Sequence, residues 1–245
     1  MNTIDIANMD AIDWLHHPHH DRYRCMIADP PDGINLKYRG FKDKITDEAY
    51  EYMLYTILNR GTFLCDFMWL SINPKWAPML GHVTYEWQKM HPDWEFKPCV
   101  QTFTFGQHNH KDFGNCHRLL YRYQRKGVCR YMDAVRVPSW RQQNGDKRAD
   151  PRGRVPGDVF DFARVTGNSK QRRAFSPTQL HEGLYERCIK SCCAPGDTVV
   201  DLFAGSGTLG RVAPRCEVNA LMIEWSRETV DNILADQPET EEVYY

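Results

Sequence analysis

One stretch of the chain decides its fold class: residues 198–208, with the sequence TVVDLFAGSGT. An apolar run ends in an acid, and a glycine-rich turn separates it from residues that begin a helix. Gly205 and Gly207 allow a tight turn from strand to helix and let a ligand approach the backbone closely. The turn is not a P-loop, because no Gly-Lys-Ser or Gly-Lys-Thr follows, and it lacks the full G-x-G-x-x-G spacing. This stretch predicts a nucleotide-type binding turn at the end of a strand.

A carboxylate at the end of the next apolar run supports a bound ligand. Glu224 ends the run ALMIE, 16 residues after Thr208. An acid at the end of the second strand is where nucleotide-type sites hydrogen-bond a ribose diol. The alternative to a ligand site is a glycine turn that only connects a strand to a helix. The strand before the turn, the helix after it and the acid at Glu224 together argue against that alternative.

Strand and helix signals alternate along most of the chain. Strands are predicted over residues 23–28, 62–72, 95–105, 119–124, 197–202 and 218–223, and helices over 46–60, 77–90, 178–193 and 207–213. We expect Gly61 to end the first of these helices. The alternation is typical of a Rossmann-like α/β fold with a mostly parallel sheet and helices on both faces. Residues 128–175 have frequent Gly and Pro and weak apolar periodicity, which predicts a small irregular insert.

A second motif follows the predicted strand over residues 23–28. Asp29-Pro30-Pro31-Asp32 places two prolines, which remove two N–H donors, between two carboxylates. Backbone carbonyls then remain free to accept hydrogen bonds beside a carboxylate, which suits an exocyclic amine. Alone, this sequence is an ordinary turn. Because ligands in open α/β sheets bind beyond the carboxyl ends of the strands, we expect it to share a site with the glycine turn.

These motifs, in this order, resemble those of the β-class S-adenosylmethionine-dependent DNA amino-methyltransferases, which methylate adenine N6 or cytosine N4. In that family a D/S-P-P-Y catalytic motif comes early, an F-x-G-x-G cofactor motif comes late, and target recognition lies between them, a circularly permuted order. The resemblance covers nearly the whole chain. It implies a catalytic half over residues 1–127, a target-recognition insert over 128–175 and a cofactor-binding half over 176–245.

The resemblance also assigns cofactor residues. Asn8-Met9-Asp10 looks like the family's acid that contacts the cofactor adenine, and Ser176-Pro177-Thr178-Gln179 looks like its H-P-T-Q motif with Ser in place of His. The residues expected to bind S-adenosylmethionine are Asp10, Ser176, Thr178, Gln179, Asp201, Phe203, Gly205, Ser206, Gly207, Thr208 and Glu224.

One residue departs from the family pattern. The fourth residue of the catalytic motif is aromatic in the family and stacks on the flipped base, whereas this chain has Asp32. An aspartate cannot stack, and a second carboxylate beside Asp29 tends to raise one of the two pKa values. Three interpretations stay open: Tyr38 or another aromatic residue supplies the stacking, the pocket accepts a different or modified base, or the chain is an inactive member.

The chemistry implied by the resemblance needs no metal, because the methyl group on the sulfonium is already activated. Asp29 and the carbonyl of Pro31 would accept the hydrogens of the target amine, and the base would leave the duplex at a cost of a few kcal/mol. An Asp in the first motif position, here Asp29, favours adenine. The alternatives are a cytosine-N4 or modified-base enzyme, a catalytically inactive DNA-binding protein, and an RNA or small-molecule methyltransferase.

Charge is unevenly distributed along the chain. The whole chain has 31 Lys and Arg against 32 Asp and Glu, but residues 111–176 have 16 against 6. A basic segment of this kind suits the phosphates of double-stranded DNA, although a solvated loop is the alternative. The residues predicted to contact DNA are Arg136, Trp140, Arg141, Lys147, Arg148, Arg152, Arg154, Arg172 and Arg173.

Other features limit the classes of protein. No apolar run is long enough to span a bilayer, the mean hydropathy is −0.62, and the N-terminus has acids where a signal peptide has bases. The nine cysteines form no C-x-x-C pair, so we expect reduced thiols in a core and no metal. We expect a cytoplasmic protein, bacterial or made by a phage in its host. Analogy with the family suggests a homodimer.

Overall fold

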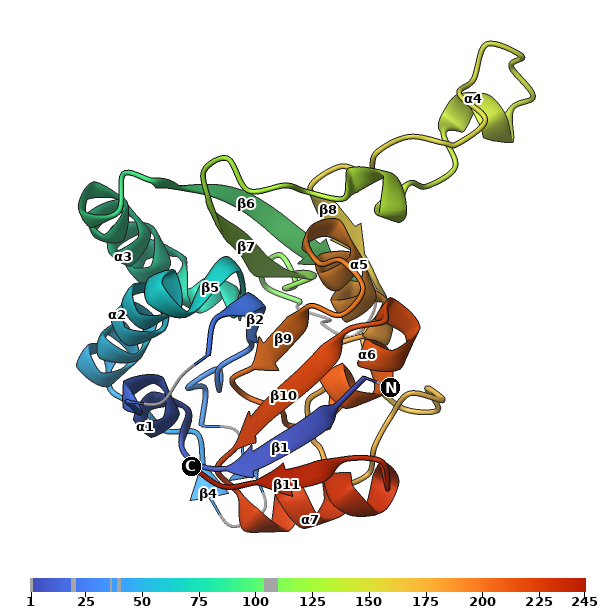
Figure 1. Ribbon diagram of the computed structural model, residues 1–245. Coiled ribbons are helices and arrows are strands. Elements are labelled where there is room, and N and C mark those ends of the chain that lie inside the picture. The colour runs from blue at the N-terminus through green and yellow to red at the C-terminus, as the bar shows by residue number, and fades with distance from the viewer. Residues whose placement is uncertain (1, 19–20, 36, 39–40, 104–109) are drawn as a thin grey trace.

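The computed structural model describes residues 2–18, 21–35, 37–38, 41–103 and 110–245, the side chains of 37–38 and 41–42 excepted. Within these residues one sheet forms the centre, in the order β11-β1-β10-β9-β2-β5-β7-β6-β8 (Figure 1). Its strands are β1 (Ile4–Asn8), β2 (Tyr23–Ala28), β5 (Cys65–Ile72), β6 (Trp94–Thr102), β7 (His117–Arg125), β8 (Val159–Asp161), β9 (Thr198–Asp201), β10 (Asn219–Glu224) and β11 (Glu241–Val243). Among the described strand pairs of this sheet, β7 runs antiparallel to β5 and β6 and all other pairs are parallel. The predicted mostly parallel sheet is confirmed.

Helices cover both faces of the sheet, as predicted. On one face lie α1 (Ala11–His16), α2 (Asp47–Leu64) and α3 (Ala77–Met90), and on the other lie α5 (Glu182–Cys192), α6 (Thr208–Cys216) and α7 (Arg227–Asp236) (Figure 1). Strand β2 shows how the sequence builds the two cores. Cys25 and Ile27 pack on the face of α5 and α6, whereas Met26 and Ala28 pack on the face of α1 and α2, because successive side chains of a strand point to opposite faces.

Helix α2 corrects one prediction. Gly61 does not end the helix, which continues to Leu64, and β5 therefore begins at Cys65 and not at residue 62. A Cβ atom on Gly61 would lie 2.3 Å from the Met68 sulfur and 2.4 Å from the Met26 terminal methyl carbon. The glycine lets the helix pack closely on the sheet, so its role is close packing and not chain reversal.

Several elements have no counterpart in the sequence predictions. These are β1, α1, α7, β11, the short 3-10 helices η1 (Pro74–Trp76) and η2 (Met132–Val135), the helix α4 (Trp140–Gln143) and the antiparallel pair of β3 (Lys37–Tyr38) and β4 (Phe41–Lys42). The helix predicted over 178–193 begins only at Glu182, capped by His181. Strand β6 ends at Thr102, and residues 104–105 of the predicted strand lie outside the described part.

The segment predicted as an irregular insert divides into two parts. Residues 136–156, here called the arm, carry α4 and project away from the body (Figure 1). Residues 159–161 are instead a strand, β8, which pairs with β6 and belongs to the main sheet. The chain just before the arm lies at the amino edge of the parallel strands, since Tyr131 N donates to Ser191 O near the end of α5 (2.8 Å).

No helix in the described ranges is long and apolar enough to cross a membrane.

Candidate active site

A cavity of about 1050 Å³ opens at the carboxyl edge of the parallel strands, beyond the ends of β2, β9 and β10. This volume includes the solvent-filled space at its mouth. It is lined by Asp29–Asp32, Arg118, Phe175–Leu180, Tyr185, Phe203–Ser206, Thr208, Glu224–Ser226, Glu228, Thr229 and Asn232. The structure therefore brings the Asp-Pro-Pro corner and the glycine turn, 170 residues apart in the chain, to one site.

The glycine turn has the geometry that its sequence predicts. Gly205 and Gly207 have φ values of +53° and +70°, which favour glycine. A Cβ on Gly207 would lie 2.5 Å from Gln237 Nε2, whereas the nearest atom to a Cβ on Gly205 is 3.7 Å away. Gly207 is thus needed for packing against α7, and Gly205 leaves open backbone that a ligand can approach.

Two buried acids support this turn. Glu224 accepts from Gly205 N and Ser226 N, each at 3.0 Å, and lines the cavity. Burial raises the pKa of Glu224. Asp201 accepts from Phe203 N (3.1 Å) and from the Tyr185 hydroxyl (2.9 Å), is fully buried, and does not line the cavity. Burial raises the pKa of Asp201 to about 7.

The other cofactor residues predicted from the resemblance fall in two places. Residues 176–179 form a wall of the cavity. There the Ser176 hydroxyl donates to Thr178 O (2.6 Å), and the Gln179 side chain bonds to Gln171 O (2.8 Å) and Arg173 N (3.2 Å). Asp10 is not among the lining residues; it caps α1, accepting from the backbone N–H groups of residues 12 and 13.

The structure adds a residue that the sequence reasoning missed, Arg118. Its Nη2 donates to Asp29 Oδ1 at 2.7 Å, and its Nη1 donates to both carboxylate oxygens of Asp32 at 3.0 and 3.1 Å. Its Nε donates to Ser71 Oγ at 3.1 Å. Asp29, Asp32, Arg118 and Ser71 are here called the charged corner. Arg118 reaches it because β7 is antiparallel, so that the start of β7 lies at the carboxyl edge of its neighbours.

The electrostatics of the charged corner differ from those of two bare carboxylates. The pKa of Asp29 is raised, chiefly by burial and in addition by the charge of Asp32, whereas Arg118 acts in the opposite direction. Burial opposes the charge on Arg118, but the two carboxylates outweigh it, and its pKa lies above the ordinary value. The pKa rise that the sequence predicts for one of the two carboxylates is found at Asp29, and burial is its largest cause.

Aromatic residues near the charged corner have other contacts. Tyr50 and Trp76 stack on each other with ring centroids 4.0 Å apart and planes 9° apart, and both are buried. Trp76 Nε1 donates to Asp32 O (2.8 Å). The side chain of Tyr38, the aromatic residue proposed from sequence, lies outside the described part of the chain.

None of the nine residues predicted to contact DNA lines the cavity. Arg172 and Arg173 come just before its wall, and Arg173 Nε lies 2.6 Å from Asp236 Oδ2. The other seven belong to the arm, which has six bases against two acids. Trp140, the first residue of α4, is 72% exposed. Arg148 and Arg152 are paired with acids two residues away, at 2.9 and 3.1 Å.

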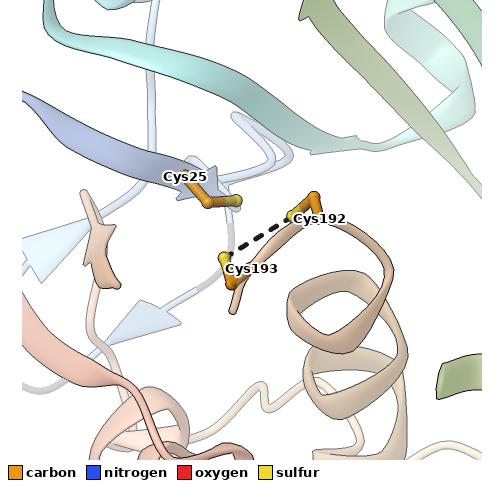
Figure 2. A group of neighbouring side chains, drawn as sticks. All are labelled: Cys25, Cys192 and Cys193. Atoms are coloured by element: carbon orange, nitrogen blue, oxygen red, sulfur yellow. Dashed lines mark hydrogen bonds between the residues drawn. The ribbon is translucent and has the colours of Figure 1, made fainter. Parts of the chain in front are cut away.

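A group of thiols lies between β2, the strand before the Asp-Pro-Pro corner, and the end of α5. The sulfur atoms of Cys25, Cys192 and Cys193 lie within 4.8 Å of one another, one from β2 and two from the end of α5 (Figure 2). Cys192 Sγ lies 3.7 Å from Cys193 Sγ and donates to Cys188 O at 3.2 Å. All nine cysteines are free. Sequence alone did not place Cys25 in this group, and the absence of a metal stays a prediction.

Comparison with known proteins identifies the class. Residues 23–235 match the N6/N4 methyltransferase family, described as DNA methylase. The type II methyltransferase M.ScaI of Streptomyces caespitosus is 26% identical over 228 residues, which are 85% of this chain and 74% of that protein. The M1.HpyAVI–SAM complex has 18% identity and a TM-score of 0.63, covering 95% of this chain and 98% of that one. The cytosine-N4-specific PvuII DNA methyltransferase has 13% identity and a TM-score of 0.69, covering 95% and 86%.

A mostly parallel sheet with a glycine turn and an Asp-Pro-Pro corner at one edge is the arrangement of an S-adenosylmethionine-dependent methyltransferase. The chain belongs to the N6/N4 DNA methylase family, because the family match covers most of its length. S-adenosylmethionine is the methyl donor of that family.

Proposed function

We propose that this chain transfers a methyl group from S-adenosylmethionine to the exocyclic amine of a base flipped out of double-stranded DNA, with adenine N6 as the acceptor. The observation that supports this most directly is the shared cavity, which brings Asp29 and Gly205 to one site. The open backbone at Gly205 and the Glu224 carboxylate beside it in the cavity fit the cofactor. When bound, S-adenosylmethionine supplies an electrophilic methyl group.

The residues of this chain would position the acceptor amine. Pro30 and Pro31 have no N–H, so the backbone at these two positions offers carbonyl acceptors without competing N–H donors. The Asp29 carboxylate and the Pro31 carbonyl would accept the amine hydrogens and direct the nitrogen lone pair toward the methyl group. Asp29 accepts in its ionised form, so its raised pKa predicts loss of rate on the acid side at a higher pH than for an ordinary carboxyl.

The choice of adenine rests on Asp29 as the first residue of the motif. The fold does not discriminate between the bases, since a neighbour with the same fold is cytosine-N4-specific. The experiment therefore has to identify the methylated nucleoside.

The arm would provide affinity for DNA away from the reacting base. The arm leaves the body at the edge of the sheet opposite the cavity. It has four more Lys and Arg residues than Asp and Glu residues. Contacts made there neutralise phosphates and are sensitive to salt. We expect them to govern the affinity for DNA and to leave the choice of base to the cavity.

A methyl-transfer assay tests the proposal. The full chain is incubated with S-adenosylmethionine carrying a deuterated methyl group and unmethylated genomic DNA, and the nucleosides are identified by mass spectrometry. We expect labelled N6-methyldeoxyadenosine, which disappears in Asp29→Ala. The matched control is Asp93→Ala, which removes a carboxylate before β6 at the opposite edge of the sheet.

Two outcomes would contradict the proposal. Labelled N4-methyldeoxycytidine would overturn the choice of base. Binding of both S-adenosylmethionine and DNA without transfer would instead support an inactive DNA-binding protein. One contact favours that alternative, because Arg118 already occupies one carboxylate oxygen of Asp29.

A further inference from the structure

Arg118 lines the cavity and is bonded to Asp32, the residue at the motif position where the family has an aromatic ring. We propose that its guanidinium group forms the flat surface on which the target base stacks, and that Asp32 is a positioning residue that holds this group in place. This inference rests on the proposed function and concerns the same cavity.

The hydrogen bonds of Arg118 fix the plane of the guanidinium. Nε, Nη1 and Nη2 donate to Ser71, Asp32 and Asp29 respectively, at 2.7 to 3.1 Å. A guanidinium group donates in its own plane, so acceptors on three sides restrict both its tilt and its rotation. The side chain lines the cavity and keeps 18% of its surface exposed. The N–H groups at the edge of the guanidinium are largely hydrogen-bonded within the protein. The flat face of the guanidinium is therefore the surface best placed to meet a ligand.

The contact with Asp32 links Arg118 to the motif position at which the family has its ring. Asp32 occupies the fourth position of the motif, and its carboxylate is in contact with the guanidinium. A carboxylate with a guanidinium bonded to it reaches about as far from the backbone as a tyrosine side chain. Arginine planes stack on bases in nucleic-acid complexes, in the same way as aromatic rings.

The other aromatic residues near Arg118 are less suitable. Tyr50 and Trp76 do not line the cavity but stack on each other in the core. Phe175 lines the cavity and packs against the core on the face of α5 and α6. Tyr185 is buried and donates its hydroxyl to Asp201. Phe203 and Trp225 follow β9 and β10, on the side of the glycine turn.

Charge alone would not explain this arrangement. A lysine could neutralise Asp29 and Asp32 equally well, but it has no flat surface and cannot bond to acceptors on three sides in one plane. The comparison of arginine with lysine at position 118 therefore separates stacking from neutralisation.

The experiment measures how the pocket binds a single nucleoside. The full chain, saturated with S-adenosylhomocysteine, is titrated with 2′-deoxyadenosine, or with 2′-deoxycytidine if the methyl group is found on cytosine, and binding is followed by saturation-transfer NMR. We expect Arg118→Lys to weaken binding about 10-fold, within the range for loss of one stacked base. Asp32→Ala should cause a similar loss, and Asp32→Asn a smaller one because its amide oxygen still accepts from Nη1.

The matched control is Arg125→Lys, the same change at the other end of β7. The Arg125 side chain pairs with Asp93 and does not line the cavity. It should bind the nucleoside as the wild type does. Steady-state transfer to DNA provides a second readout: Arg118→Lys should raise KM for DNA and lower kcat, whereas Arg125→Lys should change neither.

The inference and the proposed function can fail separately. Binding that depends on Arg118 without any transfer to DNA would uphold the inference and refute the function. Transfer with unchanged nucleoside binding in Arg118→Lys would do the reverse. Absence of nucleoside binding in the wild type, or a loss caused by Tyr38→Leu and not by Arg118→Lys, would also overturn the inference.

Discussion

The Asp32→Tyr change restores the family motif, yet we expect it to destabilise this protein and to lower its activity. The change removes two hydrogen bonds to Arg118, of 3.0 and 3.1 Å, in a pair whose side chains are only 18% and 14% exposed. Removing one partner of a fully buried ion pair costs about 3–5 kcal/mol. Arg118 would keep Asp29 and Ser71, so we expect a smaller loss, about 2 kcal/mol, similar to that of a hydrogen bond to a charged group.

Thermal unfolding measures this loss. For a domain of this size, 2 kcal/mol corresponds to a fall in Tm of about 4–8 °C. The second variant is Asp32→Tyr combined with Arg118→Leu, which removes the cation that the first change leaves without its partner. We expect the double variant to be more stable than the sum of the single changes predicts, by 1 kcal/mol or more (about half of the loss above).

Two results would refute this reasoning. Single and double changes that add within about 0.5 kcal/mol would show that Asp32 and Arg118 are not energetically coupled. An Asp32→Tyr variant that is both more stable and more active than the wild type would show a decayed site, in which the aspartate has no role of its own.

Three further predictions concern the acid beneath the glycine turn, the turn itself and the arm. Burial raises the pKa of Asp201 to about 7, so folding favours its protonated form, and its contribution to stability is lost as the pH rises from about 4 through 7. Asp201→Asn should therefore be more stable relative to the wild type at pH 8 than at pH 5, measured by urea unfolding. Gly207→Ala should destabilise more than Gly205→Ala, because only Gly207 has a close side-chain neighbour, whereas both should weaken S-adenosylmethionine binding in calorimetry. Arg141→Ala with Lys147→Ala should weaken DNA binding and reduce its salt slope by about 2, one for each lost phosphate contact, without changing kcat.

Each of these has an opposite outcome that counts against it. A relative stability of Asp201→Asn that is independent of pH would contradict the buried titration. Equal stability losses at Gly205 and Gly207 would contradict the packing difference. An unchanged salt slope in the arm variant would remove the arm from the DNA contacts, and Asp93→Ala serves as the control for nonspecific effects of a charge change.

The sequence predicted the glycine turn and six of the nine described strands of the main sheet, because these depend on local patterns, but it missed the edge strands β8 and β11 and the strand β1. The run before Asp201 and the glycines after it specify a strand, a turn and a helix within a few residues. The predicted end of α2 was wrong. Gly61 lies inside the helix and allows close packing on Met26 and Met68, a tertiary contact that no local pattern reveals.

The charged corner could be predicted only in part. Asp29 and Asp32 stand in a recognisable motif, but Arg118 is one of several arginines in the run HRLLYRYQR, and nothing local distinguishes it. Its role depends on β7 being antiparallel, which is a property of the assembled sheet. The placement of the arm at the opposite edge follows from the same reversal and was equally hidden.

The reversal of β7 also makes the charged corner depend on strand register. Arg118 pairs with Gln101 of β6, while Leu119 and Leu120 pair with Ile72 and Ser71 of β5. A slip of one residue would turn Arg118 to the opposite face of the sheet and bring its neighbour, Leu119 or His117 according to the direction, beside the two carboxylates. The charge at the site is thus maintained by the backbone ladder along β5, β7 and β6, most of which lies outside the cavity.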